Sequence, residues 1–224
     1  MSTAKTDAMT TFNNIRYKAL RYALGALLPL IIVLGYFFPL LGYFLLACMF
    51  SAIFVSFFKG RYWCYWACPR GIFYDEYLSK ISLKKKIPVF FKHTAFRILW
   101  IGILMTMLTF RFIQSGGNVY AVGKALVMIL AMTTAIGIIL GMYYNTRIWC
   151  MFCPVGTMSN WFGKGKKPVK LIGDKCTGCS ICYGNCPMEI NASDYTEIGY
   201  VNNGDCIKCG KCVQGCPQQA LNLK

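Results

Sequence analysis

The sequence contains few acidic residues and almost no histidine. It has eight aspartates and glutamates and one histidine, His93, among 224 residues. A single histidine excludes a b-type haem held by two histidines of this chain, and the absence of a C-x-x-C-H motif excludes attached c-type haem. The sequence also lacks a nucleotide-binding glycine motif, a serine nucleophile elbow and a catalytic His–carboxylate pair. We therefore expect no self-contained substrate chemistry, and leave open whether the chain is an enzyme.

Charge is scarce over long stretches of the chain. Charged residues make up 14% of the sequence and hydrophobic residues 56%, whereas soluble domains carry about 25% charge. The 37 residues from Tyr22 to Phe58 contain no charge, which is too many for one span of about 20 residues and enough for two short spans with a turn at Pro39. Two further apolar segments follow. We predict four membrane helices at about 19–37, 40–58, 96–113 and 122–144, arranged as two hairpins.

Lysine and arginine predict the orientation of these spans. Of the 24 basic residues, only Arg111 and Lys124 fall in the two short connections on one side. The positive-inside rule therefore predicts a multi-pass protein of the cytoplasmic membrane, with both termini and all cysteine motifs in the cytoplasm. Arg21 and Arg97 are counted among the flanking charges. The net charge of +16 then reflects topology and lipid headgroups, and no nucleic-acid partner is expected. We expect no secretory cleavage, so the first span is retained.

Eight of the 13 cysteines form two runs near the end of the chain. Each run reads C-x2-C-x2-C-x3-C-P, and the second lies 30 residues after the first. In bacterial two-cluster ferredoxins with this spacing, the fourth cysteine of each run ligates the other [4Fe–4S] cluster. Cluster I is therefore predicted at Cys176, Cys179, Cys182 and Cys216, and cluster II at Cys206, Cys209, Cys212 and Cys186.

Two further cysteine pairs occur in similar stretches, "RYWCYWACPRG" at 61–71 and "RIWCMFCPVG" at 147–156. Each pair directly follows the second span of a predicted hairpin, so two-fold packing would bring four sulfurs together at one membrane face. We predict a third iron–sulfur cluster at Cys64, Cys68, Cys150 and Cys153. A thiol–disulfide switch, another metal, or no role are the alternatives.

Arginine and tryptophan also occupy equivalent positions in the two stretches. Arg61 and Arg147 could donate hydrogen bonds to cluster sulfurs or extend to lipid phosphates, and both hypotheses stay open. Trp63 and Trp149 are expected in an aromatic belt at the lipid headgroups, which is compatible with shielding a cluster from water.

Gly71 and Gly156 close the two stretches. We expect both to relieve the backbone after the preceding proline. Cys48 falls inside the second predicted span, where an inert buried thiol is expected.

With these motifs, the chain resembles the membrane-bound polyferredoxins of the NapH, NosR and MauN type, most of all NapH. The second pair departs from the family's C-x3-C-P pattern because only two residues separate Cys150 and Cys153. The resemblance implies an all-α four-helix transmembrane part of two hairpins plus a small α+β two-cluster ferredoxin domain. The expected boundaries are 1–18 for a cytoplasmic N-terminus, 19–164 for the membrane domain and 165–224 for the ferredoxin domain.

The resemblance also implies a function, which is electron transfer between membrane quinol and partner redox subunits. We predict an iron–sulfur subunit relaying electrons between a quinone or a partner cofactor and redox partners, another membrane subunit among them. The direction of flow stays open. One alternative is an accessory reductase that helps another metalloenzyme to mature, and another is a membrane anchor whose clusters only stabilise the fold.

Overall fold

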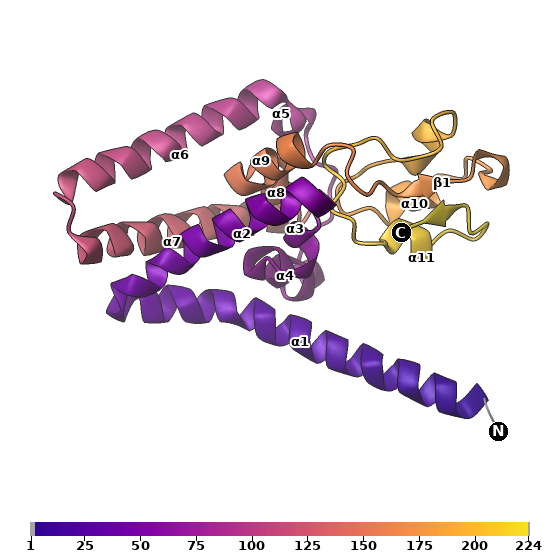
Figure 1. The fold of residues 1–224 in the computed structure, drawn as a ribbon, viewed down its shortest axis with the longest axis horizontal. Coiled ribbons are helices and arrows are strands. Elements are labelled where there is room, and N and C mark those ends of the chain that lie inside the picture. Colours follow the sequence, from indigo (N-terminus) through magenta and orange to yellow (C-terminus); the bar gives the residue numbers. More distant parts are fainter. Residues whose placement is uncertain (1–2, 224) are drawn as a thin grey trace.

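The computed structural model describes residues 3–223, with side chains from Tyr17 onward (Figure 1). Most of the predicted N-terminal segment, residues 1–18, therefore lies outside the residues whose side chains are described, as does Lys224. A helical part is joined at one end to a small, cysteine-rich part near the C-terminus. The main helices are α1 (Thr3–Phe37), α2 (Tyr43–Lys59), α6 (Thr94–Gln114) and α7 (Val119–Tyr143).

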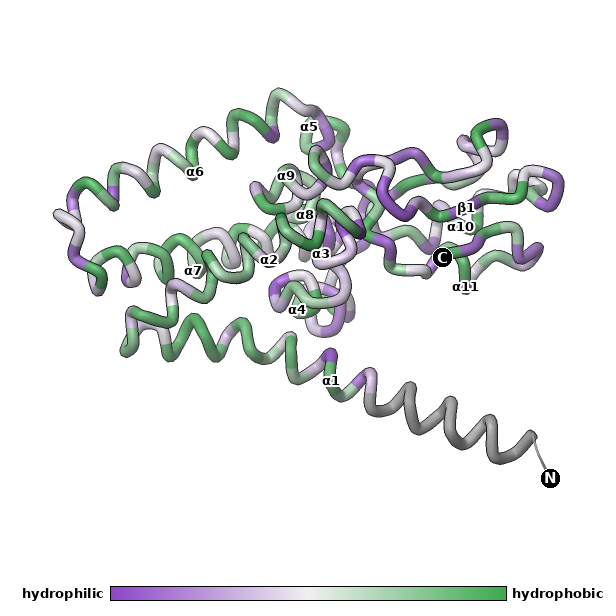
Figure 2. The backbone as a smooth tube through the Cα atoms, in the orientation of Figure 1, coloured by the Kyte–Doolittle hydropathy of each residue, from purple (hydrophilic) through white to green (hydrophobic). Residues whose placement is uncertain are grey.

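These four helices are long and apolar enough to cross a membrane. The candidate spans are Tyr17–Phe37, Pro39–Lys59, Thr94–Gln114 and Val119–Tyr143. Figure 2 shows hydrophobic colouring along all four, whereas hydrophilic residues gather around the C-terminal part. The prediction of four apolar membrane helices is confirmed, and each span lies close to its expected position.

The turn between α1 and α2 packs against α7. It contains the short 3-10 helix η1 (Pro39–Gly42), which begins at the proline that the sequence identified as a turn. A Cβ on Gly42 would overlap the carbonyl oxygen of Gly123, and a Cβ on Gly123 would overlap the carbonyl oxygen of Pro39. Glycine at both positions is what allows this close contact between backbones.

Short helices carry the two membrane-face cysteine stretches. The first contains α3 (Trp63–Trp66) and α4 (Pro69–Glu76), and the second contains α8 (Ile148–Phe152) and α9 (Pro154–Gly163). Both α4 and α9 begin with the proline that follows a cysteine, the position at which proline lacks only a hydrogen bond that the helix would not make. Helix α4 packs on α1, and α9 packs on α2. The connection between α4 and α6 contains η2 (Leu78–Lys80) and α5 (Val89–Lys92).

The cysteine-rich C-terminal part combines short helices with one small sheet. Strands β1 and β2 pair antiparallel and place Lys170 opposite Asn222. Ser180 and Gly210 adopt left-handed conformations directly before α10 and α11, so the two cysteine runs fold alike. The elements are β1 (Lys170–Leu171), η3 (Gly173–Lys175), α10 (Ile181–Gly184), η4 (Ala192–Tyr195), α11 (Lys211–Gln214) and β2 (Leu221–Asn222).

The contact between η1 and α7 gives a first prediction. We expect Gly123→Ala to lower the free energy of unfolding by about 1–3 kcal/mol, because the added methyl group overlaps a backbone carbonyl that cannot rotate away. Gly102→Ala is the matched control, since a Cβ at Gly102 has no atom within 4 Å. Thermal unfolding in detergent measures both variants. Equal melting temperatures in the two variants would contradict the role of this contact.

Candidate functional site

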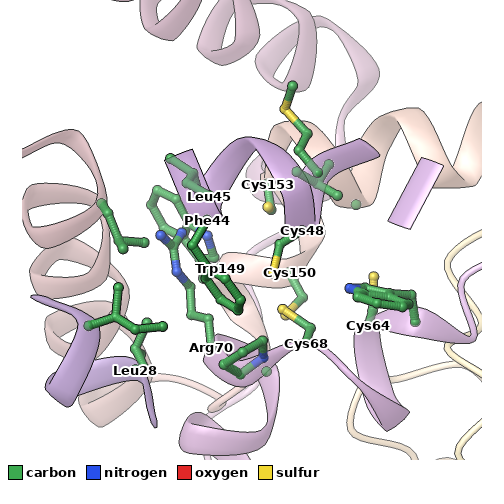
Figure 3. Close-up of a pocket in the computed structure, with 18 of the residues that line it drawn as sticks. Leu28, Phe44, Leu45, Cys48, Cys64, Cys68, Arg70, Trp149, Cys150 and Cys153 are labelled. Carbon is green, nitrogen blue, oxygen red and sulfur yellow. The ribbon is translucent and has the colours of Figure 1, made fainter. Parts of the chain in front are cut away.

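The four membrane-face cysteines line one cavity. Cys64 lies in α3 and Cys150 in α8, while Cys68 and Cys153 directly precede α4 and α9. Figure 3 shows these cysteines arranged around the same space, from segments far apart in the sequence. The structure therefore brings together the four residues predicted for the third cluster. Their assignment as ligands stays a prediction.

The cavity extends from the cysteines into the apolar interior of the membrane helices. Helices α1, α2 and α7 contribute apolar side chains to its wall, and α2 also contributes Cys48 (Figure 3). The apolar lining residues from these three helices are Leu28, Ile31, Phe44, Leu45, Met49 and Leu130. A group bound between the cysteines would thus border a space that opens among the spans.

Arg61 and Arg147 each form a hydrogen bond with the cysteine stretch to which they do not belong. The Arg61 guanidinium donates to the carbonyl oxygen of Cys150 at 2.5 Å, and Arg147 donates to the carbonyl oxygen of Cys64 at 2.8 Å. Their exposed fractions are only 1% and 0%, so extension to lipid phosphates is wrong for both. Arg147 Nη1 also lies 3.6 Å from the Cys150 sulfur. We call Arg61 and Arg147 the crossed arginine pair.

The two motif glycines make room for this pair. A Cβ on Gly71 would lie 2.7 Å from Arg147 Nη1, and a Cβ on Gly156 would lie 2.7 Å from Arg61 Nη2. Neither glycine has a positive φ. The expected reason, relief of the backbone after proline, is therefore wrong. Each glycine is needed because a side chain there would meet the other stretch's guanidinium and the carbonyl oxygen of its own stretch's first cysteine, which lies 2.5 Å from a Cβ on Gly71 and 3.0 Å from one on Gly156.

Arg147 forms ion pairs inside the membrane part. It contacts both carboxylate oxygens of Asp75 in α4, at 2.9 Å and 2.5 Å. Arg21 of α1 reaches the same carboxylate and also pairs with Glu76 at 2.6 Å. Burial alone would raise the pKa of Asp75, but the charge and hydrogen bonds of Arg147 lower it below its ordinary value. Arg21 lies near the start of the candidate span Tyr17–Phe37 and is 5% exposed, so its guanidinium is held by these carboxylates and does not face lipid headgroups.

Arg61 pairs with the C-terminal part. Its guanidinium donates to Asp205 at 2.7 Å. Arg97, at the start of α6, donates to both oxygens of Asp205 at 2.9 Å and 2.7 Å, and Asn160 of α9 donates at 2.7 Å. Arg97 lies near the start of the candidate span Thr94–Gln114 and is also buried, so it too is held by a carboxylate and does not face lipid headgroups.

The hydrogen-bond donors around the cavity suit an anionic occupant, whereas burial favours the neutral form of the free thiols. Burial raises the pKa of Cys64, and burial together with the charge of Cys64 raises the pKa of Cys68 to about 12. Two buried donors, Trp149 Nε1 and Arg61 Nε, have no partner among residues 17–223, and both residues line the cavity. Four soft sulfur ligands, two guanidiniums and unpaired N–H groups fit an iron–sulfur cluster.

Trp149 does not belong to an aromatic belt, so that expectation is wrong for this residue. It is 1% exposed and packs edge-on against Phe152 and Trp100. Trp149 is therefore part of the core beside the cysteines, which is consistent with the shielding role but not with a headgroup position.

The eight C-terminal cysteines also fall into two groups. Cys176, Cys179, Cys182 and Cys216 line one pocket. Burial, and then the charges of Cys206, Cys209 and Cys186, raise the pKa of Cys212 to about 12. This effect indicates that these four cysteines lie near one another. These are the quartets predicted from the spacing, although their occupancy by clusters stays a prediction. No three His, Cys, Asp or Glu side chains in the described part of the chain are close enough to hold one metal ion.

Sequence reasoning did not single out Asp75, Asp205 or Arg70. Arg70 lines the cavity, donates to Thr133 of α7 at 3.1 Å and lies over the Trp149 ring, 5.4 Å from its centroid. The scarcity of acidic residues was a usable signal for the two aspartates. In a chain with eight acids and 24 basic residues, an acid beside a cysteine motif is an evident partner for a buried arginine.

Comparison with known proteins identifies the family. A 4Fe-4S binding domain family matches residues 41–88 and 127–172, each covering a membrane helix and the cysteine stretch after it. A 4Fe-4S dicluster domain family matches residues 175–221. The chain belongs to the NapH-like ferredoxin-type membrane proteins. It is an iron–sulfur membrane protein of the electron-transfer type, with 4Fe–4S domains in both of its parts.

Three relatives illustrate the similarity of the whole chain and of its C-terminal part to known proteins. The uncharacterized protein MJ0749 of Methanocaldococcus jannaschii is 27% identical over 176 residues, 77% of this chain and 68% of the relative. The ferredoxin-type protein NapH of Escherichia coli is 26% identical over 179 residues, 73% of this chain but only 61% of NapH. A ferredoxin of Methanothermococcus thermolithotrophicus is 36% identical over 58 residues, 25% of this chain and 97% of the ferredoxin. No solved structure matches the chain significantly.

The crossed arginine pair gives a second prediction. Gly156→Ala would place a methyl group against Arg61 Nη2 and the Cys150 carbonyl oxygen, displacing a buried guanidinium. We expect the free energy of unfolding to fall by about 1–3 kcal/mol. Gly184→Ala is the control, because a Cβ there has no atom within 4 Å. Chemical or thermal unfolding measures both, and an equal effect at the two sites would refute the packing argument.

Proposed function

We propose that the chain is a membrane-anchored electron-transfer subunit with three iron–sulfur clusters. Two would lie in the C-terminal part, and one would be held by Cys64, Cys68, Cys150 and Cys153 at the membrane face. The observation that carries this proposal is that both repeated stretches meet around one cavity. The arginine of each stretch also donates to the carbonyl oxygen of the first cysteine in the other. When bound, iron–sulfur clusters supply one-electron transfer at potentials set by charge and hydrogen bonds.

The third cluster is favoured over a thiol–disulfide switch by the surroundings of the four sulfurs. A redox-active dithiol pair needs access to a partner thiol. Here Cys64 and Cys150 are only 8% and 9% exposed, and all four cysteines surround a common space. The crossed arginine pair offsets the negative charge that four thiolates would bring into this buried position.

The arrangement in the membrane follows from the same proposal. The membrane domain, 19–164, would consist of two hairpins, with the cysteine stretches and the ferredoxin domain, 165–224, on the cytoplasmic side. Support comes from the basic residues, which concentrate outside the two short turns on the other side. Redox partner subunits would then meet the ferredoxin domain from the cytoplasm.

A quinone or quinol is the proposed partner on the membrane side. The apolar wall contributed by α1, α2 and α7 suits a lipid-soluble molecule bordering the cysteines. Arg70 provides a hydrogen-bond donor for a quinone oxygen, because it forms no ion pair with a carboxylate among the described residues. Electrons would pass between this molecule and the clusters in single steps, in a direction that the proposal leaves open.

Iron content tests the third cluster. Anaerobically purified protein is expected to contain about 12 iron atoms and about 12 acid-labile sulfides per chain, the content of three cubanes. Cys64→Ser is expected to contain about 8, because one cluster loses a ligand. Cys48→Ser is the matched control, since Cys48 lines the same cavity outside the two motifs. About 8 iron atoms in the unmutated protein would refute the third cluster.

Arg70 gives a fourth prediction, on quinone exchange. We expect Arg70→Met to keep its iron but to exchange electrons with duroquinol roughly tenfold more slowly, because a charged hydrogen-bond donor to the quinone oxygen is lost. Stopped-flow absorbance of the clusters measures the rate. Arg111→Met, which changes an exposed arginine far from the cavity, should behave like the unmutated protein. An unchanged rate in Arg70→Met would contradict this site.

A further inference from the structure

Contacts between the C-terminal part and the membrane part come from segments beside the cluster II cysteines. Asp205 directly precedes Cys206 and is bound by Arg61, Arg97 and Asn160. On the other side of the same cluster, Glu189 follows Cys186 by three residues. Its carboxylate accepts from the Ile87 amide and from Lys92, both at 2.8 Å.

Burial follows the same pattern. Ile207 and Met188, which are 2% and 1% exposed, belong to the core that contains Cys64, Cys150 and Trp149. Trp66 Nε1 donates to the Lys208 carbonyl oxygen at 3.3 Å. Among residues 17–223, by contrast, no hydrogen bond or ion pair joins Cys176–Cys182 to the membrane part, and Cys179 is exposed. One half of the C-terminal part is thus held against the membrane face, and the other half is turned away.

Asp205 stands out among these contacts because three separate elements converge on it. Arg61 follows α2, Arg97 begins α6 and Asn160 lies in α9. The contact is close enough that a Cβ on the neighbouring Gly204 would overlap the Asn160 side chain. Arg61 is also one member of the crossed arginine pair, so a single side chain contacts both Cys150 and the segment before Cys206.

We propose that Asp205 is a positioning residue that fixes cluster II against the membrane-face centre, so that electrons pass between that centre and cluster I through cluster II. The proposal rests on the proposed function, since it assigns an order to the three clusters. It makes the exposed cluster I edge around Cys179 the surface that meets the soluble redox partner. Asp205 acts through Arg61 and Arg97 and is not itself a ligand.

Asp205→Asn in the full chain tests the docking. It removes the negative charge that faces two buried guanidiniums, so amide hydrogen exchange at Met188–Glu189 and Ile207–Lys208 should rise roughly tenfold or more. Asp174→Asn, the same change two residues before the first cysteine of the other run, is the matched control and should leave this exchange unchanged. Unchanged exchange in Asp205→Asn would overturn the positioning role.

Electron paramagnetic resonance of the dithionite-reduced protein tests the order. In the unmutated protein, magnetic interaction is expected between cluster II and the membrane-face centre. It should be lost in Asp205→Asn, with all iron retained, and kept in Cys179→Ser, which removes a ligand of cluster I. The opposite result, interaction lost in Cys179→Ser and kept in Asp205→Asn, would overturn the proposal.

Two further outcomes separate this inference from the proposed function. If Asp205→Asn does not fold, Arg97→Gln replaces it, because Arg97 binds Asp205 from α6 and does not line the cavity. The same loss of interaction and rise in exchange are expected. An unmutated protein with about 8 iron atoms would refute the third cluster, whereas the exchange measurement would still decide whether Asp205 positions the C-terminal part.

Discussion

The fold depends on the compensation of two buried guanidiniums. A buried charge is costly unless ion pairs and hydrogen bonds satisfy it, and Arg61 and Arg147 are 1% and 0% exposed. Each donates to the carbonyl oxygen of the first cysteine in the other stretch and to an aspartate farther away. The two stretches therefore cannot separate without breaking hydrogen bonds of two buried guanidiniums. This constraint holds the cysteines of both repeats around one space, whether or not that space is occupied.

The symmetry of the crossed pair ends at the aspartates. Arg147 pairs with Asp75 of α4, within the membrane part, whereas Arg61 pairs with Asp205 of the cysteine-rich part. The residue between proline and glycine also differs, because Arg70 occupies the position that Val155 has in the second stretch. One repeat thus carries a cation that contacts α7 from the cavity, and the arginine of the same repeat binds the C-terminal part. The first stretch of the repeat therefore contacts both parts of the protein: Arg70 contacts the membrane helices, and Arg61 contacts the cysteine-rich C-terminal part.

The sequence predicted those features that depend on local pattern. Long apolar runs located the four helices, and cysteine spacing selected the quartets that the structure groups together. It did not reveal partners joined over long distances in the chain. Arg61 and Asp205 are 144 residues apart, and Arg147 and Asp75 are 72 apart. Without these partners, Arg21 and Arg97 read as flanking charges and Trp149 as a belt residue. Arginine near a span has the same signature whether it meets lipid phosphate or a buried carboxylate, and only tertiary packing distinguishes the two.

In the proposed electron-transfer site, the same arginines that hold the fold would also act on the bound cluster. Each electron added to a thiolate-bound cluster increases the negative charge in a buried place, where it costs more than in water. With a cluster bound, two guanidiniums beside the four sulfurs would favour the state with the additional electron, as nearby positive charge favours any anionic form. Pairing of the guanidiniums with Asp75 and Asp205 would reduce this effect. The same carboxylates that stabilise the fold would thus lower the affinity of the cluster for an electron. Because Asp205 directly precedes Cys206, its negative charge would act on the neighbouring predicted cluster as well.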